Sequence, residues 1–473
     1  EHIVYEYKHE QEPPAPPDMR DYRAQRYLKR VHYGNATAYE HLYGWNEDSW
    51  KQQHWHFHLV FDYGEHSTDP QAAPTFDEQR AWPARADPIW SQAYGFEIGT
   101  RRLCRNILMF HAFAGELGPV PMLVQQLMLE HRQSPWGYSL LAATHALAYD
   151  SLGQAERRPP TEYDYTPFTL SPSAPGWSRF DAMPGLDDGY SYQLVDLYGE
   201  GLPGVLSCQD KAWYYREPLR DATGGDQLRY GEWARLEHSP VANTGKAVHQ
   251  SLADLTGDAR LDWIVSAPGM HGYFTLDPDR EWSHFVPFNA FPKEFFHPAA
   301  QMADLIGNGL SDMVLIGSRS VRLYANRRDA GFAPGLDVPH PQDQYEGDEL
   351  PLAGTSPTQL VAFADVLGSG SVQLVRIRHD EVKCWPNLGH GRFGKGFVLC
   401  TLPFNSTQFS AEQIRLTDLD GSGAADLICL TPDTVKVFMN HAGSGYRSTP
   451  VELPWPDGVR YDRFCQVSTV DLQ

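Results

Sequence analysis

A six-residue pattern that recurs at a nearly constant interval constrains the fold of this 473-residue chain more than any other feature. Each copy reads aspartate, an apolar residue, any residue, glycine, any residue, and then glycine or alanine. Successive aspartates lie 58, 50, 61, 53 and 53 residues apart. The copies begin at Asp196, Asp254, Asp304, Asp365, Asp418 and Asp471. Such a period indicates that one structural unit is repeated along the chain.

The residues around each copy predict a strand, a tight loop and a second strand. An apolar run precedes the pattern, as at 192–195 and 360–363, and another follows it, as at 261–265 and 313–316. Glycine readily adopts the positive φ angles that tight loops need. The carboxylate of the leading aspartate can accept hydrogen bonds from amides of its own loop.

A second signal lies about twenty residues after the first and predicts two further strands. Asn326, Asn387 and Asn440 each end an apolar run, and a glycine with an aromatic residue follows at Phe332, Phe393 and Tyr446. Four strands per repeat are typical of a propeller blade, which buries its faces against neighbouring blades around an axis. An ordinary globular domain with recurring Asp-Gly turns is the alternative, but it does not account for the repeated strand spacing.

The two signals together resemble the FG-GAP or VCBS repeat. We therefore predict an all-β chain with an FG-GAP type β-propeller over residues 171–473. About six blades are expected, and the last is truncated because the chain ends three residues into the copy at Asp471.

Residues 1–170 carry no such repeat but contain many strand-like runs. These runs span 3–8, 27–33, 57–63, 100–110, 121–131 and 139–149, and the last two are joined by Gln-Ser-Pro-Trp-Gly, a plausible hairpin connection. Strands in series predict an antiparallel β-strand wall. A helix is the alternative for the alanine-rich run 139–149. The Arg157-Arg-Pro-Pro segment is expected to lead into the propeller.

Several longer segments resemble SpvB-like proteins and the B component of insecticidal Tc toxin complexes. In the wall they are 27–35, 60–65 and 95–111, and in the propeller they include 262–265, 295–298, 312–317 and 384–394. The resemblance covers nearly the whole chain. The family's N-terminal part, the end of its propeller and the wall that follows have no counterpart in this sequence.

The resemblance implies a structural and gating role in a secreted bacterial toxin complex. In that family the B component joins the C component to enclose a cytotoxic cargo in a hollow β-walled shell. The propeller docks on the pore-forming A component and gates release of the cargo. The residues 1–170 would form part of the shell, and residues that line the gate or the docking surface are unknown. No catalytic residue is implied, so we expect a protein that is not an enzyme.

Composition and charge exclude other classes. Sixty acidic residues oppose 39 basic ones, and the net charge of −21 disfavours nucleic acid and anionic membrane surfaces as partners. No apolar run is long enough to span a bilayer, and the first residues lack the plan of a signal peptide. The six cysteines are scattered, which indicates neither a zinc site nor a disulfide scaffold. A chain that begins without Met and ends inside a repeat is expected to be a fragment.

One repeat loop has the residues expected of a calcium site. Calcium prefers six or more oxygen ligands, and Asp418, Asp420, Ser422 and Asp426 place side-chain oxygens at suitable positions. The other loops carry Tyr198, Thr256, Ile306 and Leu367 at the second ligand position. Calcium at this one loop is the possible cofactor, and none is required. The alternative is that aspartate and glycine simply shape the turn.

The remaining candidates are weaker. His54, His56 and His58 alternate along one predicted strand and could present a metal, but no carboxylate or cysteine partner accompanies them, and a polar outer face is the preferred explanation. Two other functions stay open: a calcium-stabilised adhesion propeller that binds a host protein, and a propeller enzyme such as a lyase or hydrolase.

Overall fold

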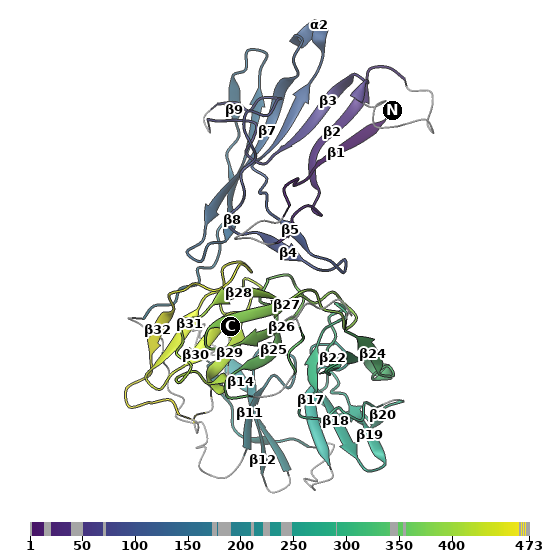
Figure 1. The fold of residues 1–473 in the computed structure, drawn as a ribbon, viewed down its shortest axis with the longest axis vertical. Helices are drawn as coiled ribbons and strands as arrows, with labels where there is room; N and C mark the ends of the chain where they lie inside the picture. The colour runs from purple at the N-terminus through teal and green to yellow at the C-terminus, as the bar shows by residue number, and fades with distance from the viewer. Residues whose placement is uncertain are drawn as a thin grey trace.

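The computed structural model of the chain describes most of its length. The described residues are 2–13, 20–38, 51–69, 72–172, 177, 191–209, 212–220, 228–237, 248–289, 291–340, 349–352, 356–462, 465, 467 and 469. They form two units, a wall sheet and a propeller stacked end to end (Figure 1). Asp471, where a further blade was predicted to begin, lies outside these residues.

The N-terminal unit is an eight-stranded antiparallel sheet with the strand order β1-β2-β3-β6-β7-β8-β10, in which β9 also pairs with β8. Its strands are β1 (Ile3–Lys8), β2 (Tyr27–Asn35), β3 (Trp55–Asp62), β6 (Asn106–His111), β7 (Met122–Gln133), β8 (Ser139–Tyr149), β9 (Ala155–Arg157) and β10 (Thr161–Glu162). A separate hairpin, β4 (Ile89–Ser91) with β5 (Ile98–Thr100), and the short helix α2 (Ala114–Leu117) complete the unit. Val60, Leu108, Phe110 and Leu123 form its buried apolar cluster.

The alanine-rich run is a strand, so the helical alternative is wrong. β8 pairs with β7 from Gln125↔Ala148 to Gln133↔Ser139, which makes this hairpin the longest in the sheet. The predicted strand 100–110 is shorter than expected and begins pairing at Asn106. Before it, Arg102 instead binds Glu10 with Nε to Oε1 at 2.6 Å, and the Arg101 amide donates to the Tyr27 hydroxyl. These side-chain contacts divert the segment from the sheet.

The C-terminal unit is a β-propeller in which the described residues form five four-stranded blades, so the predicted all-β class and propeller are confirmed. We number the blades 1 to 5 in chain order. Blade 1 comprises β11 (Ser191–Val195), β12 (Gly204–Gln209), β13 (Ala212–Arg216) and β16 (Ala234–Arg235), and blade 2 comprises β17 (His249–Ala253), β18 (Asp262–Ala267), β19 (Met270–Phe274) and β20 (Val286–Pro287). Blade 3 comprises β21 (Gln301–Ala303), β22 (Asp312–Ile316), β23 (Ser320–Tyr324) and β24 (Leu336–Pro339), and blade 4 comprises β25 (Leu360–Ala364), β26 (Gln373–Ile377), β27 (Glu381–Trp385) and β28 (Phe397–Thr401). Blade 5 comprises β29 (Ile414–Thr417), β30 (Asp426–Leu430), β31 (Thr434–Phe438) and β32 (Val451–Pro454). Outside the blades lie the pair β14 (Pro218–Arg220) and β15 (Leu228–Tyr230), and the 3₁₀ turns η2 (Arg328–Ala330) and η3 (Ala411–Gln413).

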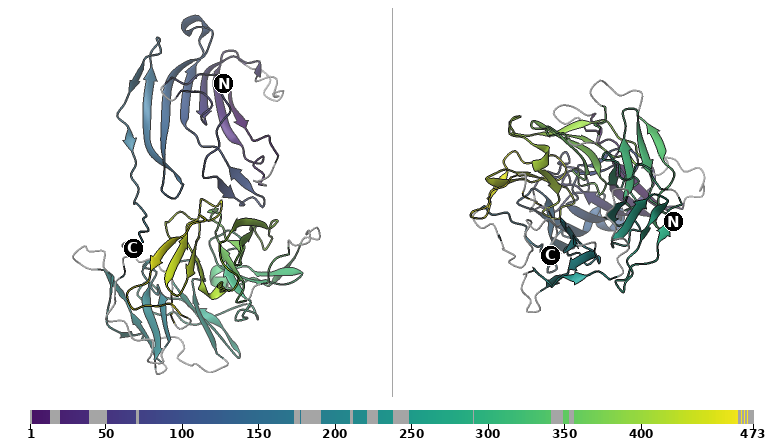
Figure 2. Two further views of the ribbon diagram at one scale, coloured as in Figure 1. Left: turned by 60° about the vertical axis from the view of Figure 1, so that its left-hand side comes forward. Right: turned by 90° about the horizontal axis from the view of Figure 1, so that it is seen from below.

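The blades stack face to face around an axis, as the view from below in Figure 2 shows. The second strand of each blade is the most deeply buried, and every residue of β30 is buried. Apolar clusters join successive blades: Ile264 of blade 2 packs with Met313 of blade 3, and Val314 of blade 3 packs with Leu374 of blade 4. A single blade could not bury both of its faces, which explains the repetition. No helix of the described residues is long and apolar enough to cross a membrane.

A buried asparagine fastens each of blades 3, 4 and 5 to the blade before it. The Nδ2 of Asn326 donates to the Leu255 carbonyl at 3.0 Å, and that of Asn440 donates to the Val366 carbonyl at 2.9 Å. Asn387 makes a longer contact of 3.5 Å with the Asp304 carbonyl. These asparagines are the residues that the sequence pattern singled out. Each contact joins two blades at their repeat loops and satisfies a carbonyl that would otherwise lose its hydrogen bond on burial.

Replacing Asn440 with alanine is expected to destabilise the propeller by about 1–3 kcal/mol, because the substitution leaves buried polar groups unpaired. The Val366 carbonyl loses this donor, whereas the Ala425 carbonyl, to which Nδ2 also donates at 3.0 Å, keeps the Tyr446 hydroxyl. Chemical denaturation followed by tryptophan fluorescence measures the effect. Asn289→Ala, at an exposed bend, is the matched control and should change stability by less than about 0.5 kcal/mol. Equal effects of the two variants would contradict the asparagine's role.

Candidate functional site

The leading aspartate of each repeat organises its own loop. In all five described loops its carboxylate accepts hydrogen bonds from the amides four and five residues later, at 2.6–3.2 Å. Asp304, for example, accepts from Asn308 and Gly309. This is the turn-shaping role that the sequence analysis set beside calcium binding. Each of these carboxylates therefore has a structural role, which is to hold the backbone of its own loop.

A second polar residue, eight positions after the first, links the loop to the asparagine. Asp312 accepts from the Leu305 amide through Oδ2 and from the Asn326 amide through Oδ1, at 3.0 and 2.9 Å. Asp426 makes the same two contacts in blade 5, with Leu419 and Asn440. Blade 4 uses the neutral Gln373, whose Oε1 accepts from the Val366 amide at 2.9 Å. Burial raises the pKa of Asp262 and of Asp426 to about 6, so ionising either carboxyl group costs free energy.

The candidate calcium loop in blade 5 brings three of its four predicted residues together. Carboxylate oxygens of Asp418, Asp420 and Asp426 lie within 4.8 Å of one another. Burial and the neighbouring Asp418 raise the pKa of Asp420. Ser422 donates its amide to Asp418 and Asp420, and its hydroxyl lies 3.4 Å from the Ala424 amide. Three convergent carboxylates are a donor set that a hard divalent cation accepts.

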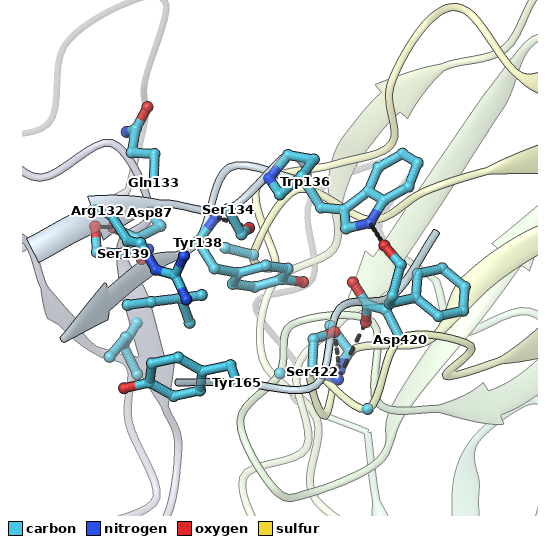
Figure 3. A pocket seen from close by; sticks show the side chains of 18 of the residues that line it. Asp87, Arg132, Gln133, Ser134, Trp136, Tyr138, Ser139, Tyr165, Asp420 and Ser422 are labelled. Carbon is cyan, nitrogen blue, oxygen red and sulfur yellow. Dashed lines mark hydrogen bonds between the residues drawn. The ribbon is translucent and has the colours of Figure 1, made fainter. Parts of the chain in front are cut away.

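A cavity of about 680 Å³ separates this loop from the wall sheet. The β7–β8 hairpin, the segment 165–169 and the blade 5 loop line it. Tyr138 points from the hairpin toward Asp420 and Ser422, and the Trp136 indole donates to the Phe168 carbonyl at 3.2 Å (Figure 3). Arg132 and Tyr165 lie on the opposite side (Figure 3). Burial raises the pKa of Tyr138 to about 12, so this phenol stays protonated at neutral pH. Sequence reasoning could not place this cavity, because its walls come from segments nearly 300 residues apart.

The hairpin tip fits closely against blade 5. Arg447 of blade 5 donates from Nη2 to the Pro135 carbonyl at 2.5 Å, and its guanidinium lies 5.2 Å from the Trp136 ring. Gly137 has a φ of +98°, and a Cβ atom there would lie 2.4 Å from the His441 ring. A residue with a side chain would therefore clash at this point. The hairpin thus holds the wall in one position over the propeller.

An apolar contact joins the wall to blades 4 and 5 at a second place. Tyr22 and Trp90 of the wall belong to the same buried cluster as Val375 and Leu427 of these blades. The guanidinium of Arg20 lies 3.9 Å from the Trp90 ring and 4.6 Å from the Phe397 ring. Burial of one such aromatic side chain contributes roughly 1.5–3 kcal/mol. The two units therefore share part of one core.

The histidines of β3 do not share one outer face, so that interpretation was wrong. His54 is exposed, His56 is half-buried, and His58 is buried with its Nδ1 2.8 Å from the Nδ1 of His32. Burial lowers the pKa of His58 to about 4, which keeps this ring neutral. Val60 and Asp62, which share the face of His58 by the alternation of the strand, are also buried. This face of β3 therefore points inward rather than to solvent.

A buried ionic cluster in the wall escaped sequence reasoning. The Lys29 ammonium contacts the Glu65 carboxylate and lies 2.6 Å from Nε2 of His66, and all three residues are at most 2% exposed. Burial lowers the pKa of Lys29 and of His66. Glu65, His66 and Glu78 are close enough to hold a metal, but the ammonium of Lys29 already lies against all three. The sequence signal for this cluster was the alternation of side chains along β2, which places Tyr27 and Lys29 on the same, buried side of the strand.

Comparison by sequence relates the wall to one protein family. The family described as Salmonella virulence plasmid 65kDa B protein, SpvB, matches residues 1–113. Proteins named mono(ADP-ribosyl)transferase SpvB, from Salmonella typhimurium and Salmonella dublin, are 48% identical to this chain over 141 residues. That stretch is 30% of this chain and 23% of the relatives.

Comparison by structure covers both units. The Tc holotoxin pore of Photorhabdus luminescens contains a chain that matches 100% of this one at 40% identity and a TM-score of 0.86. A crystal structure of TcdB2-TccC3 matches 99% at 38% identity and a TM-score of 0.68. In both cases this chain covers 22% of the other.

These relatives correct one prediction. The sequence analysis expected a protein that is not an enzyme, and the names of the SpvB relatives, which are transferases, contradict that expectation. The expectation rested on the resemblance to the B component, which implied no catalytic residue. The N-terminal stretch that matches this chain is less than a quarter of the length of those relatives. The transferase name therefore describes the relatives as whole proteins.

Proposed function

We propose that this chain is a shell component of a bacterial toxin complex. The premise is that it is an SpvB-like protein of the Tc toxin B-component type. In this proposal the wall sheet is part of a hollow shell, and the C component supplies the rest of that shell. The shell encloses the cytotoxic part of the C component. The propeller docks on the pore-forming A component and gates the passage of the cargo, and the complex acts outside the bacterium.

One observation carries this proposal: the wall and the propeller, in this order, match toxin-complex structures along the whole chain. The contacts between the two units support it. Trp90 and Trp136 anchor the wall on blades 4 and 5, so the shell and the propeller would move together there. A long antiparallel wall also suits an enclosure, because neighbouring strands satisfy each other's backbone groups.

The propeller we propose is of the FG-GAP type with about six blades. The five described blades share the aspartate loop and four-strand order of that repeat. The sixth blade would contain the copy of the pattern that begins at Asp471. A closed ring would leave an axial channel whose width changes when blades move relative to each other.

Binding of the complete protein to the pentameric A-component pore tests the docking proposal. We expect a complex with a Kd below about 1 μM, measured by interferometry and confirmed as a co-eluting species in size-exclusion chromatography. The isolated C component, at the same concentration, serves as the negative control for non-specific adsorption. A protein that is folded by circular dichroism and does not associate would contradict the docking proposal and favour the adhesion propeller.

We also propose that the blade 5 loop binds one calcium ion. Asp418, Asp420 and Asp426 would supply carboxylate oxygens, and Ser422 an oxygen at the fourth predicted position. Desolvation and mutual repulsion raise the pKa of Asp420 and Asp426, and a bound cation would offset both effects. In this role calcium shapes and stiffens the loop beneath the wall hairpin, and it supplies no catalytic chemistry.

Calcium at about one hundred times its Kd is expected to stabilise the protein by about 2.7 kcal/mol. For a chain of this size the unfolding midpoint then rises by several degrees, which differential scanning calorimetry measures. Asp420→Asn should abolish the rise. Asp304→Asn removes the leading carboxylate of blade 3, whose loop has Ile306 at the second ligand position, and should leave the rise unchanged. A midpoint that does not respond to calcium, or responds equally in both variants, would refute the calcium site.

A further inference from the structure

A lysine, a glutamate and a histidine meet in the interior of the wall, and the proposed function gives them no role. Lys29 lies on β2, and Glu65 and His66 lie in the loop that follows β3. The side chain of Lys29 is 3% exposed, and that of Glu65 is 0% exposed. The cost of removing two charges from water offsets much of their attraction, so a buried ion pair adds little net stability. Stability alone therefore does not explain why these residues are buried together.

The loop after β3 holds Glu65 in a fixed position against β2. Asp62, the last residue of β3, accepts a hydrogen bond from the Gly64 amide at 2.7 Å and so shapes the start of the loop. The Glu65 carboxylate faces inward, where its Oε1 contacts the Lys29 ammonium. Its Oε2 instead accepts from the Tyr63 amide at 2.8 Å. The two carboxylate oxygens thus have different partners, an amine on one side and a backbone donor on the other.

His66 is arranged to accept a proton from Lys29. Its Nδ1 lies 2.8 Å from the carbonyl oxygen of Thr75. Because a carbonyl only accepts, Nδ1 carries the ring proton, and the neutral ring presents Nε2 as an acceptor. This Nε2 lies 2.6 Å from Nζ of Lys29. Burial lowers the pKa of His66, which favours the neutral ring, and burial also lowers the pKa of Lys29, which favours the neutral amine.

We propose that Lys29 and Glu65 condense to an isopeptide bond, which cross-links β2 covalently to the loop after β3. The amine nitrogen Nζ attacks Cδ of Glu65, and the Cδ–Nζ bond forms. Two protons pass from Nζ to Oε1, one directly as the ion pair becomes an amine and a carboxylic acid, and one through Nε2 of His66. The Cδ–Oε1 bond then breaks, and Oε1 leaves as water. The reaction needs no oxidant and no further reactant.

The surroundings favour the amide over the ion pair. The Tyr63 amide donates to Oε2, which carries the negative charge of the tetrahedral intermediate and becomes the amide oxygen. An amine and a carboxyl group held in contact react as one molecule, without the entropy cost of bringing them together. The product replaces two buried charges with a neutral amide, which removes the cost of keeping them from water. The wall itself would thus supply the driving force.

A second carboxylate near the lysine lacks these conditions. Glu78 lies 3.7 Å from Nζ of Lys29, and its side chain is 37% exposed. It also binds Lys8 at 2.8 Å. Water and a second cation stabilise its charge, so we expect no bond between Lys29 and Glu78.

Peptide mass spectrometry of the complete protein, unfolded and digested with trypsin, tests the cross-link. The bond would prevent cleavage after Lys29 and join peptide 27–30 to peptide 52–80, with a mass equal to the sum of the two minus one water molecule. Fragment spectra should place the bond at Glu65. Lys436 and Glu452, an ion pair of 3.0 Å whose side chains are 32% and 51% exposed, are the internal control and should stay unlinked.

Two variants separate the chemistry from the fold. Lys29→Arg keeps a cation beside Glu65 but has no primary amine, so no linked peptide should form. His66→Gln removes the proton acceptor, and the linked fraction of newly made protein at a fixed time should fall at least about tenfold. An undiminished linked fraction in His66→Gln would overturn the role of His66.

The unaltered protein gives the decisive result without either variant. A linked peptide with its bond at Glu65 supports the proposal, whether or not the protein binds the A component. Cleavage after Lys29 together with a free peptide 52–80 would overturn it. A bond from Lys29 to Glu78, or an equal degree of linkage between Lys436 and Glu452, would overturn it as well.

Discussion

The propeller depends on a hydrogen-bonded unit that is repeated at its blade junctions. A buried asparagine reaches across to a loop carbonyl of the preceding blade, and a buried acid or glutamine holds that loop in place. Backbone groups in these tight loops cannot pair within a sheet ladder, and burial without partners would cost free energy. The side chains therefore satisfy the loops and fix the relative position of the blades at the same time. Apolar packing supplies most of the stability, and these contacts determine how the blades align.

The repeat unit could be predicted from the sequence because its chemistry is local. Aspartate, glycine and asparagine at fixed spacing define the turns, and the structure places Asp196, Asp254, Asp304, Asp365 and Asp418 in equivalent loops. Contacts between distant segments could not be predicted from the sequence. The Lys29 ion pair, the cavity beside Tyr138 and the stacking of Arg20 on Trp90 each bring together residues with no shared local pattern. Alternation along β3 shows that His56 and His58 share a face, but which face is buried depends on packing against distant segments.

The aligning role of the asparagines is tested most directly by electron cryomicroscopy of the complete protein carrying Asn440→Ala. If these contacts fix the relative position of the blades, blade 5 will shift against blade 4, where the contact of Asn440 with the Val366 carbonyl is lost. The junction of blades 2 and 3, which Asn326 holds, will be unchanged. An unchanged alignment of blades 4 and 5 in the variant would contradict the account.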